Sequence, residues 1–317
     1  MLHLDSDSVK KLLNFELSLL LSEEAFKLHS SGQVDQPLRT IIKGGENELM
    51  GVMPAYIKSG IYQGFGLKSV LVRLGAGTSI PSHMGSILIY GEADAPPIVA
   101  VDAGAITEIR TAAASAHATR MLAAPSASRV SILGTGLQAK AHLLAMKKVR
   151  PIKHVSIWGR SEEARQSFAI WCKRDCNLSV SIHSSVAEAV NDCDIICTTT
   201  AARSPILKST DLPRHCHINA IGSSALGFQE LHEDIYQDSA LFTDCNQSVL
   251  AASECVIKAV QKGLLPSQGV GTEIGTLSVD SMPTHQPGVS IFKSVGLAVQ
   301  DLVFSREVIR RWVAASS

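Results

Sequence analysis

Hydrophobic and polar positions alternate in two different ways along the chain. In the first part, apolar residues of Ser6–Leu28 fall at helical spacing, and short apolar runs bounded by Gly, Pro and Asp follow. These runs predict strands over residues 38–43, 48–54, 64–73, 86–90 and 98–102. The Ala-rich stretch Thr107–Ala124 contains no Gly or Pro and predicts a long helix that ends before Pro125. This part predicts a mixed or antiparallel sheet with one covering helix.

From Arg129 the pattern changes to short runs of β-branched residues, which are separated by segments of helical composition. The runs predict strands over residues 129–133, 154–158, 179–183, 195–199, 217–221 and 241–243. Strands that alternate with helices form βαβ units and a parallel sheet. The stretch Ser294–Trp312 predicts one more helix. The predicted fold class is α/β, with a Rossmann-type, doubly wound parallel sheet beside a second, α+β region.

Composition and charge narrow the classes of protein to which the chain can belong. Its 317 residues include 29 basic and 29 acidic side chains, and this zero net charge argues against nucleic-acid binding. The sequence contains no run of about 18 apolar residues that would predict a membrane span. We expect no signal peptide, and the odd number of cysteines, seven, favours a reducing, cytoplasmic location.

Several charged residues and residues of metal-binding types are interpreted as parts of the fold and not as binding sites. The basic residues that follow the first helix of the parallel region are interpreted as a solvated helix end; they are Lys147, Lys148, Arg150 and Lys153. Arg306, Arg310 and Arg311 are expected on the polar face of the last helix. Neither Cys193 with Cys197 nor His215-Cys216-His217 has the spacing of a zinc site, so we predict core residues and no metal.

A phosphate-binding turn is predicted directly after the first strand of the parallel region. Gly134-Thr-Gly-Leu-Gln-Ala139 has the pattern G-x-G-x-x-A and opens a helix. Gly134 suits the tight turn, Gly136 lets the backbone approach a pyrophosphate, and Ala139 allows close helix–strand packing. The N–H groups of the helix N-terminus would bind the phosphates. The motif predicts dinucleotide binding, and a glycine-rich turn without a ligand is the alternative.

The end of the next strand bears on which dinucleotide binds. A site selective for NAD places Asp or Glu there, whereas Arg accommodates the 2′-phosphate of NADP. This chain has Gly159, Arg160 and Ser161 at that point, and Arg165 follows one helical turn later. We predict NADPH as the cofactor, bound by Arg160 with help from Ser161 and Arg165. NADH is the alternative, in which the two arginines are solvated and one of the glutamates after Ser161 replaces the missing acid.

Seven sequence blocks then stand in a distinctive order along the chain. They are Gln36-Pro-Leu-Arg39, Gly66-Leu-Lys68, Pro81-Ser-His83, Ile106-Thr-Glu-Ile-Arg-Thr-Ala-Ala113, Ile132-Leu-Gly-Thr-Gly-Leu-Gln-Ala139, Ile218-Asn-Ala-Ile-Gly222 and Phe292-Lys-Ser-Val-Gly-Leu-Ala-Val-Gln-Asp301. In order and spacing the chain resembles the ornithine cyclodeaminase/mu-crystallin family. The resemblance implies a homodimer in which residues 1–120 and 294–317 form a discontinuous domain for dimerisation and substrate binding. It places a Rossmann domain at residues 121–293 and implies a bound nicotinamide cofactor.

The resemblance also assigns roles to single residues. Arg39, Lys68 and Arg110 match the basic positions of the family's substrate site, and converging cations suit a carboxylate. Ser82 and His83 match positions near the nicotinamide. The full set of predicted cofactor-binding residues is Ser82, His83, Arg110, Gly134, Gly136, Leu137, Gln138, Gly159, Arg160, Ser161, Arg165, Thr199, Ile221, Ser223 and Ser294.

One position departs from the cyclodeaminase pattern and points to a different reaction. Cyclodeaminases have an Asp two residues after Gly222, where this chain has Ser224. A serine hydroxyl without an activating partner is not a general base near neutral pH, which disfavours ornithine cyclodeamination. The ketimine-reductase branch also has Ser there. We therefore predict hydride transfer to the C=N bond of a cyclic imino acid, Δ1-pyrroline-2-carboxylate or Δ1-piperideine-2-carboxylate, to give L-proline or L-pipecolate.

The predicted catalytic residues are Lys68, His83 and Ser224. Lys68 or His83 would donate the proton to the imine nitrogen, unless water does so before binding, and Ser224 would hydrogen-bond the ring nitrogen or a water molecule. Two alternatives remain open. The first is an L-amino-acid dehydrogenase or a reductase of acyclic imino acids, and the second is an NADP-binding protein without turnover.

Overall fold

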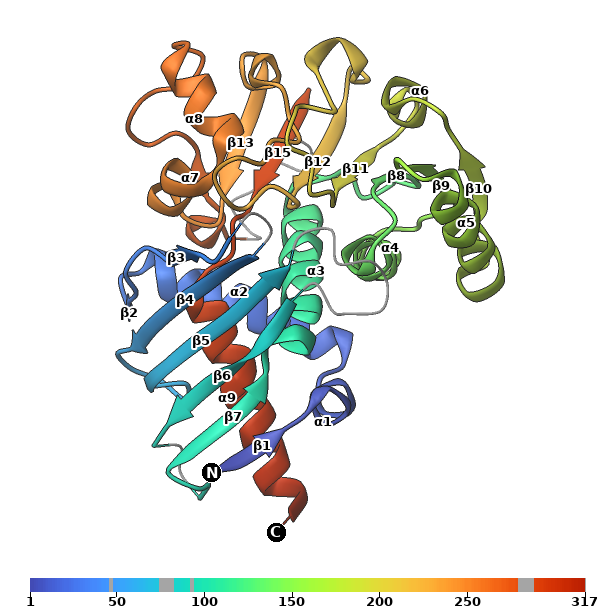
Figure 1. The fold of residues 1–317 in the computed structure, drawn as a ribbon. Coiled ribbons are helices and arrows are strands. Elements are labelled where there is room, and N and C mark those ends of the chain that lie inside the picture. The colour runs from blue at the N-terminus through green and yellow to red at the C-terminus, as the bar shows by residue number, and fades with distance from the viewer. Residues whose placement is uncertain (46–47, 74–82, 92–93, 279–287, 317) are drawn as a thin grey trace. The chain divides into compact units, whose positions relative to one another are not determined.

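The chain folds into two compact units, each built around its own sheet (Figure 1). The computed structural model describes residues 1–45, 48–73, 83–91, 94–278 and 288–316. The first unit contains Met1–Arg110 and Leu297–Ser317, and the second contains Thr111–Gly296. This division and the predicted domain boundary after residue 120 both fall within one helix, α3 (Ala103–Leu122).

Among the described residues, the sheet of the first unit has seven strands. They are β1 (Leu2–Leu4), β2 (Val34–Asp35), β3 (Thr40–Lys43), β4 (Glu48–Ile57), β5 (Gly64–Arg73), β6 (His83–Tyr90) and β7 (Ile98–Asp102). They follow the order β1-β7-β6-β5-β4-β2, with β3 also paired to β4, and only the β1–β7 pair is parallel. The predicted mixed sheet is confirmed. Strands β1 and β2 were not predicted, because such short strands show little alternation of apolar and polar residues.

The helix predicted over Ser6–Leu28 is wrong as a single element. The structure has α1 (Ser6–Leu12) and α2 (Phe15–Ser30) in its place. The side chain of Asn14 accepts a hydrogen bond from Leu17 N at 2.9 Å, and this N-cap starts the second helix.

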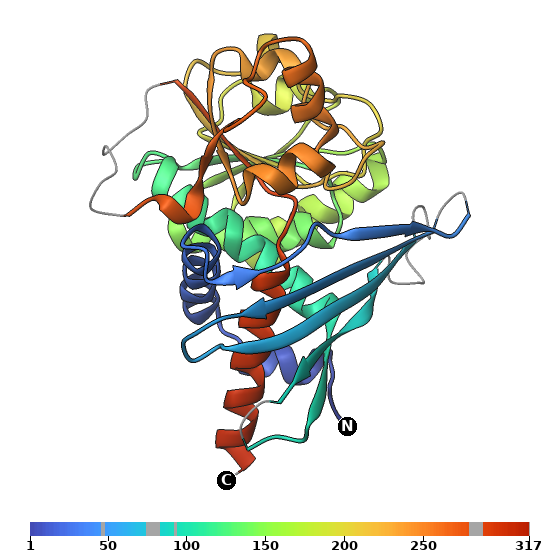
Figure 2. The ribbon, with the colours of Figure 1, turned by 90° about the vertical axis from the view of Figure 1, so that its left-hand side faces the viewer.

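The C-terminal helix α9 (Ala298–Ser316) packs against α2 and against β4, β5 and β6, so helices cover one face of this sheet (Figure 2). Arg306 on α9 is buried and not on the polar face as predicted. Its Nη2 donates to Phe65 O at 3.0 Å and to Tyr90 O at 3.4 Å. Gly64 makes room for it, since a Cβ there would lie 2.2 Å from Nη2.

Within the described part of the second unit, the sheet has eight strands, all parallel. They are β8 (Arg129–Leu133), β9 (His154–Trp158), β10 (Ser179–Ile182), β11 (Ile195–Thr198), β12 (Cys216–Ala220), β13 (Ser239–Thr243), β14 (Thr272–Glu273) and β15 (Val289–Lys293). Their order is β10-β9-β8-β11-β12-β15-β13-β14. The first five positions have the 3-2-1-4-5 order of a Rossmann fold, which confirms the predicted α/β class. The topological switch point lies between β8 and β11.

Helices and short 3-10 turns connect these strands. They are α4 (Leu137–Val149), α5 (Glu162–Cys176), α6 (Val186–Val190), α7 (Asn246–Ala252), α8 (Glu254–Gln261), η1 (Ser209–Asp211), η2 (Glu233–Tyr236) and η3 (Ile274–Thr276). The inner strands β8, β9, β11, β12 and β15 are mostly buried, as expected for a parallel sheet covered by helices, whereas the edge strands β10 and β14 are partly exposed. Within the described ranges, none of the helices has the length and apolar character that crossing a membrane requires.

The basic end of α4 is less solvated than predicted. Arg150 donates hydrogen bonds to five backbone carbonyls at 2.7–2.9 Å, four of them in or just after the last turn of α3; the acceptors are Thr119, Arg120, Ala123, Ala124 and Val149. One arginine thus satisfies the carbonyl groups that end α3.

Candidate active site

A buried ion cluster lies in the first unit, around Asp301 in the first turn of α9. Lys68 Nζ, from β5, donates to Asp301 Oδ1 at 2.9 Å, and Arg110 Nε donates to the same oxygen at 3.3 Å. Lys68 Nζ also donates to Thr107 Oγ1 at 2.6 Å. Lys68 is 2% exposed, Arg110 7% and Asp301 0%. Two cations share one carboxylate, so the three side chains together have a net charge of +1. This net positive charge suits an anionic ligand.

The charge state of Lys68 is set by its surroundings. Burial lowers the pKa of Lys68 from 10.5 to about 8, although the carboxylate of Asp301 opposes this change. Arg110 and Arg39 lower the pKa further through charge repulsion, which places Arg39 within electrostatic reach of Lys68. The structure thus joins Lys68 and Arg110 in one cluster, with Arg39 within electrostatic reach of Lys68, while the role of the three residues in substrate binding stays a prediction.

Asp301 was not assigned from the sequence, although a signal for it exists. It occupies the apolar stripe of α9 together with Phe304 and Val308, which are both buried. An acidic residue on such a stripe requires a buried cation as its partner. The Oδ2 atom of Asp301 is buried and has no hydrogen-bond partner among the described residues.

The predicted phosphate-binding turn of the second unit follows β8 at its carboxyl end. Gly134 has φ +125°, and a Cβ there would lie 2.6 Å from Thr199 Oγ1, so this position needs glycine. Gly136 is the N-cap of α4 without a side-chain hydrogen bond, and a Cβ there would meet nothing within 4 Å. Leu137 is 58% exposed and begins α4, with Gln138 next to it. An open helix N-terminus beside the switch point fits the pyrophosphate of a dinucleotide.

The structure distinguishes the two arginines after β9. Arg160 is exposed, as a residue that reads a 2′-phosphate has to be. Arg165 is half-buried, and its Nη1 donates to Gly159 O at 3.1 Å and to His183 O at 3.2 Å. The hydroxyl of Ser161 caps α5. Arg165 therefore fixes the backbone of the turn, and Arg160 is the arginine directed to solvent.

The remaining predicted cofactor residues follow β11, β12 and β15. Ile221 and Ser223 are buried and Ser224 is half-buried. The Oγ of Ser223 has no hydrogen-bond partner within the part of the chain that the structure describes. Thr199 Oγ1 donates to the carbonyl oxygen at the end of β8 at 3.2 Å. Ser294 Oγ donates to a buried carboxylate in its own unit, Asp244 Oδ2, at 2.8 Å.

Two predicted residues are placed only in part. Ser82 lies outside the described residues. His83 begins β6, where its backbone pairs with Val72 of β5.

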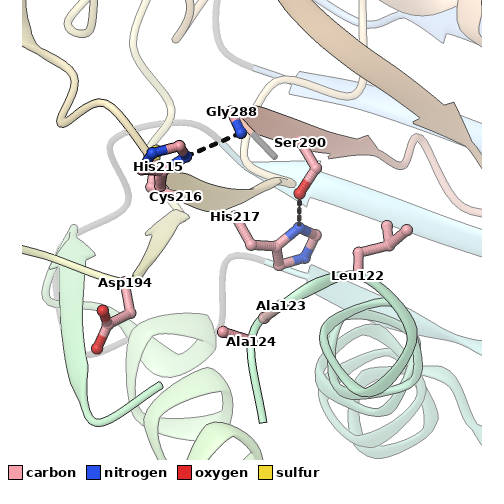
Figure 3. Close-up of a pocket in the computed structure, with 9 residues that line it drawn as sticks. All are labelled: Leu122, Ala123, Ala124, Asp194, His215, Cys216, His217, Gly288 and Ser290. Carbon is pink, nitrogen blue, oxygen red and sulfur yellow. Dashed lines mark hydrogen bonds between the residues drawn. The ribbon is translucent and has the colours of Figure 1, made fainter. Parts of the chain in front are cut away.

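A cavity of about 60 Å³ lies in the second unit, at the amino ends of the strands of the parallel sheet (Figure 3). Asp194 precedes β11, and His217 and Ser290 stand near the amino ends of β12 and β15. His217 Nδ1 lies 3.0 Å from Ser290 Oγ, and burial lowers the pKa of His217 to about 3, which keeps the ring neutral. Because the phosphate-binding turn stands at the carboxyl ends of the strands, this cavity is not part of the candidate site.

Comparison with known proteins agrees with these features. The chain matches the ornithine cyclodeaminase/mu-crystallin family over residues 2–316. It is 33% identical to the ketimine reductase mu-crystallin of Mus musculus over 289 residues, 90% of this chain and 88% of that protein. It is 28% identical to a Delta(1)-pyrroline-2-carboxylate reductase of Bacillus cereus over 321 residues, 99% of this chain and 97% of that protein.

Two solved structures of similar proteins share the whole fold. The Delta(1)-pyrroline-2-carboxylate reductase of Thermococcus litoralis, in complex with NADH and L-proline, has a TM-score of 0.92 and 26% identity, covering 100% of this chain and 98% of that one. A dimer of an archaeal alanine dehydrogenase with bound NAD has a TM-score of 0.89 and 28% identity, with 100% and 97% covered.

Proposed function

Because the chain belongs to the ornithine cyclodeaminase/mu-crystallin family, we propose that it is a nicotinamide-dependent reductase of cyclic ketimines. The names of its relatives, ketimine reductase and pyrroline-2-carboxylate reductase, support this activity. The serine at position 224 supports it too, because a reduction does not need the carboxylate that cyclodeaminases have there.

The ion cluster around Asp301 is the observation that carries the proposal. The substrate carboxylate binds to the excess positive charge of Arg39, Lys68 and Arg110, while Asp301 holds the last two in place. The negative charge of Asp301 also favours the protonated form of the imine nitrogen. A cyclic ketimine carries a negative carboxylate and, when protonated, a positive nitrogen in one small ring. The cluster offers positive side chains for the first group and the negative Asp301 for the second.

Lys68 is the proposed proton donor. With a pKa of about 8 it is charged at neutral pH and can still release its proton, as a general acid must. Thr107 Oγ1 and Asp301 Oδ1 fix the position of its ammonium group. When bound, the nicotinamide supplies the hydride for the C=N carbon.

The proposed cofactor is NADPH. Gly136 and the N-terminus of α4 bind the pyrophosphate, and the exposed Arg160 binds the 2′-phosphate. Arg165 contributes by fixing the turn, through its bonds to the carbonyl groups of Gly159 and His183.

We further propose a homodimer, formed by the face of the first sheet opposite α9. Residues that point to this face are apolar and only partly buried; they include Met50, Tyr56, Phe65, Leu67, Leu88, Tyr90 and Ile98. Exposed apolar faces of this kind mark sites of protein association. A cytoplasmic location also remains part of the proposal, because all seven cysteines are buried and form no disulfide bond among the described residues.

The first experiment compares the initial rates of NADPH and NADH oxidation with Δ1-pyrroline-2-carboxylate. We expect turnover with a preference for NADPH. The Lys68→Met variant should lower kcat/KM about 100-fold or more, because a buried charged donor is lost. Lys58→Met, which removes a half-exposed lysine of the same unit, is the matched control and should leave the rate unchanged.

Three results would contradict this proposal. Binding of NADPH without turnover of this imine would refute the cyclic substrate, and turnover of an acyclic imino acid alone would favour the dehydrogenase alternative. An unchanged rate in the Lys68→Met variant would refute the role of the ion cluster.

A further inference from the structure

Glu230 is a buried carboxylate that ties together the ends of β11 and β12. It is 1% exposed. Its Oε1 accepts hydrogen bonds from Thr200 N at 2.5 Å and Thr200 Oγ1 at 2.8 Å. Its Oε2 accepts from Thr198 Oγ1 at 2.7 Å and from Ser223 N at 3.2 Å. Four donors, from the end of β11 and from the loops after β11 and β12, converge on one carboxylate, which accounts for its burial.

Lys293, at the end of β15, holds the same segment from its other side. This lysine is 1% exposed, and its Nζ donates to Ser223 O at 2.6 Å and to Ala220 O at 3.2 Å. The N–H and the C=O of Ser223 are therefore bound by two buried groups of opposite charge. The loop is also close-packed, since a Cβ at Gly222 would lie 2.4 Å from Glu230 Oε1.

These contacts lie over one half of the dinucleotide-binding edge. A Rossmann sheet binds its ligand across the carboxyl ends of its strands, with one mononucleotide on each side of the switch point. Gly136 and Arg160, the groups for the pyrophosphate and the adenosine ribose, follow β8 and β9. The nicotinamide half therefore belongs over β11 and β12, where Glu230 binds Thr200 and Ser223.

We propose that Glu230 is a positioning residue for the nicotinamide half of the cofactor. Its oxygens bind protein donors, so it acts through the loops after β11 and β12 and not on the ring itself. It aligns the buried Oγ of Ser223, which lacks a protein partner among the described residues. The inference rests on the proposed nicotinamide-dependent function and predicts that the adenosine half binds independently of Glu230.

The test is the Glu230→Gln variant, which replaces one acceptor oxygen by an NH2 group facing the N–H of Thr200 or Ser223. We expect NADPH to bind about tenfold more weakly, because the loosened loops must be ordered on binding. Binding of 2′-phospho-ADP-ribose, which lacks the nicotinamide, should stay unchanged. The kcat should fall by about 10- to 100-fold. Glu233→Gln, which alters another buried carboxylate paired with Lys262, is the control and should change neither affinity.

The ratio of the two affinities is measured by calorimetric titration and needs no turnover. A wild-type chain that binds both nucleotides but reduces no imine would refute the proposed function and leave this inference testable. Equal losses for both ligands, or an unchanged NADPH affinity, would overturn the inference. If Glu230→Gln does not fold, Thr198→Val removes one of the four donors without a change of shape. It should weaken NADPH selectively, and an unchanged ratio would overturn the inference as well.

Discussion

At the scale of single residues, Lys68 shows how burial and pairing combine to make a reactive cation. Removal from water disfavours its charge, the Asp301 carboxylate restores part of it, and two neighbouring arginines oppose it again. The outcome is a pKa of about 8, within the range where a lysine both binds an anion and transfers a proton. Asp301 is essential to this balance, because an unpaired buried lysine would lose its charge at neutral pH.

This pKa predicts a pH dependence of substrate binding. Lys68 is charged below about pH 8, so the KM for the ketimine should be low there and rise as the pH increases above 8. Steady-state kinetics from about pH 6.5 to about pH 9.5, a range that spans the pKa of Lys68, would measure this rise in KM, which should be roughly tenfold per pH unit above 8. Lys68→Arg, which keeps its charge, is the control and should flatten the profile. A profile that is the same in both proteins would contradict the role of Lys68.

The same shift affects stability with a defined sign. The folded-state pKa of Lys68, about 8, lies below the 10.5 of the unfolded chain. Between these values the unfolded state binds more protons, so the contribution of Lys68 to the free energy of unfolding rises with pH. This contribution is fully present above 10.5 and is lost as the pH falls through 8.

At the scale of elements, the end of α3 illustrates how a helix is closed by a residue from another element. The last carbonyl groups of a helix have no partner within it. Arg150, which follows α4, donates to four carbonyl groups at the end of α3, at 2.8–2.9 Å. A basic residue after a helix was expected to lie in solvent, because the sequence does not show which other helix end lies nearby.

Arg150→Met should therefore destabilise the second unit. The substitution keeps most of the side-chain volume but leaves several carbonyl groups without donors, which costs about 2–4 kcal/mol of unfolding free energy. Denaturant titration followed by circular dichroism would measure the loss. Lys153→Met, at an exposed position just beyond Arg150, should have almost no effect. An Arg150→Met protein as stable as the wild type would show that water replaces the arginine at no cost.

At the scale of the whole molecule, the features that the sequence predicted are those that depend on residues close together in the chain. The strand–helix alternation and the G-x-G-x-x-A turn are local patterns, and they predicted the parallel sheet and the position of the phosphate-binding turn. The insertion of β15 between β12 and β13 was missed, since it depends on pairing between distant segments. The Lys68–Asp301 pair joins residues 233 apart in sequence. Glu230 was missed for the same reason, because its partners lie at the ends of two strands, β11 and β12, of which β11 is distant from it in sequence.

The proposed homodimer is the prediction that concerns the whole molecule. On the sheet face opposite α9, Tyr56 and Phe65 are cross-strand partners with ring centroids 4.3 Å apart, and Phe65 is 62% exposed. A second copy of the chain would remove this apolar surface from water, whereas a charge at its centre would oppose association. Light scattering should give twice the chain mass of 33.8 kDa for the wild type and a monomer for Phe65→Glu.

Ile170→Glu is the matched control for this change. Ile170 is also 62% exposed but lies on α5 in the second unit, so the variant should stay dimeric. Monomeric wild-type protein would refute the dimer, and a dimeric Phe65→Glu protein would show that the sheet face is not the interface. Because an exposed Phe→Glu substitution places no charge in the core, a Phe65→Glu monomer that keeps the circular dichroism spectrum of the wild type would assign the loss of the dimer to the interface itself.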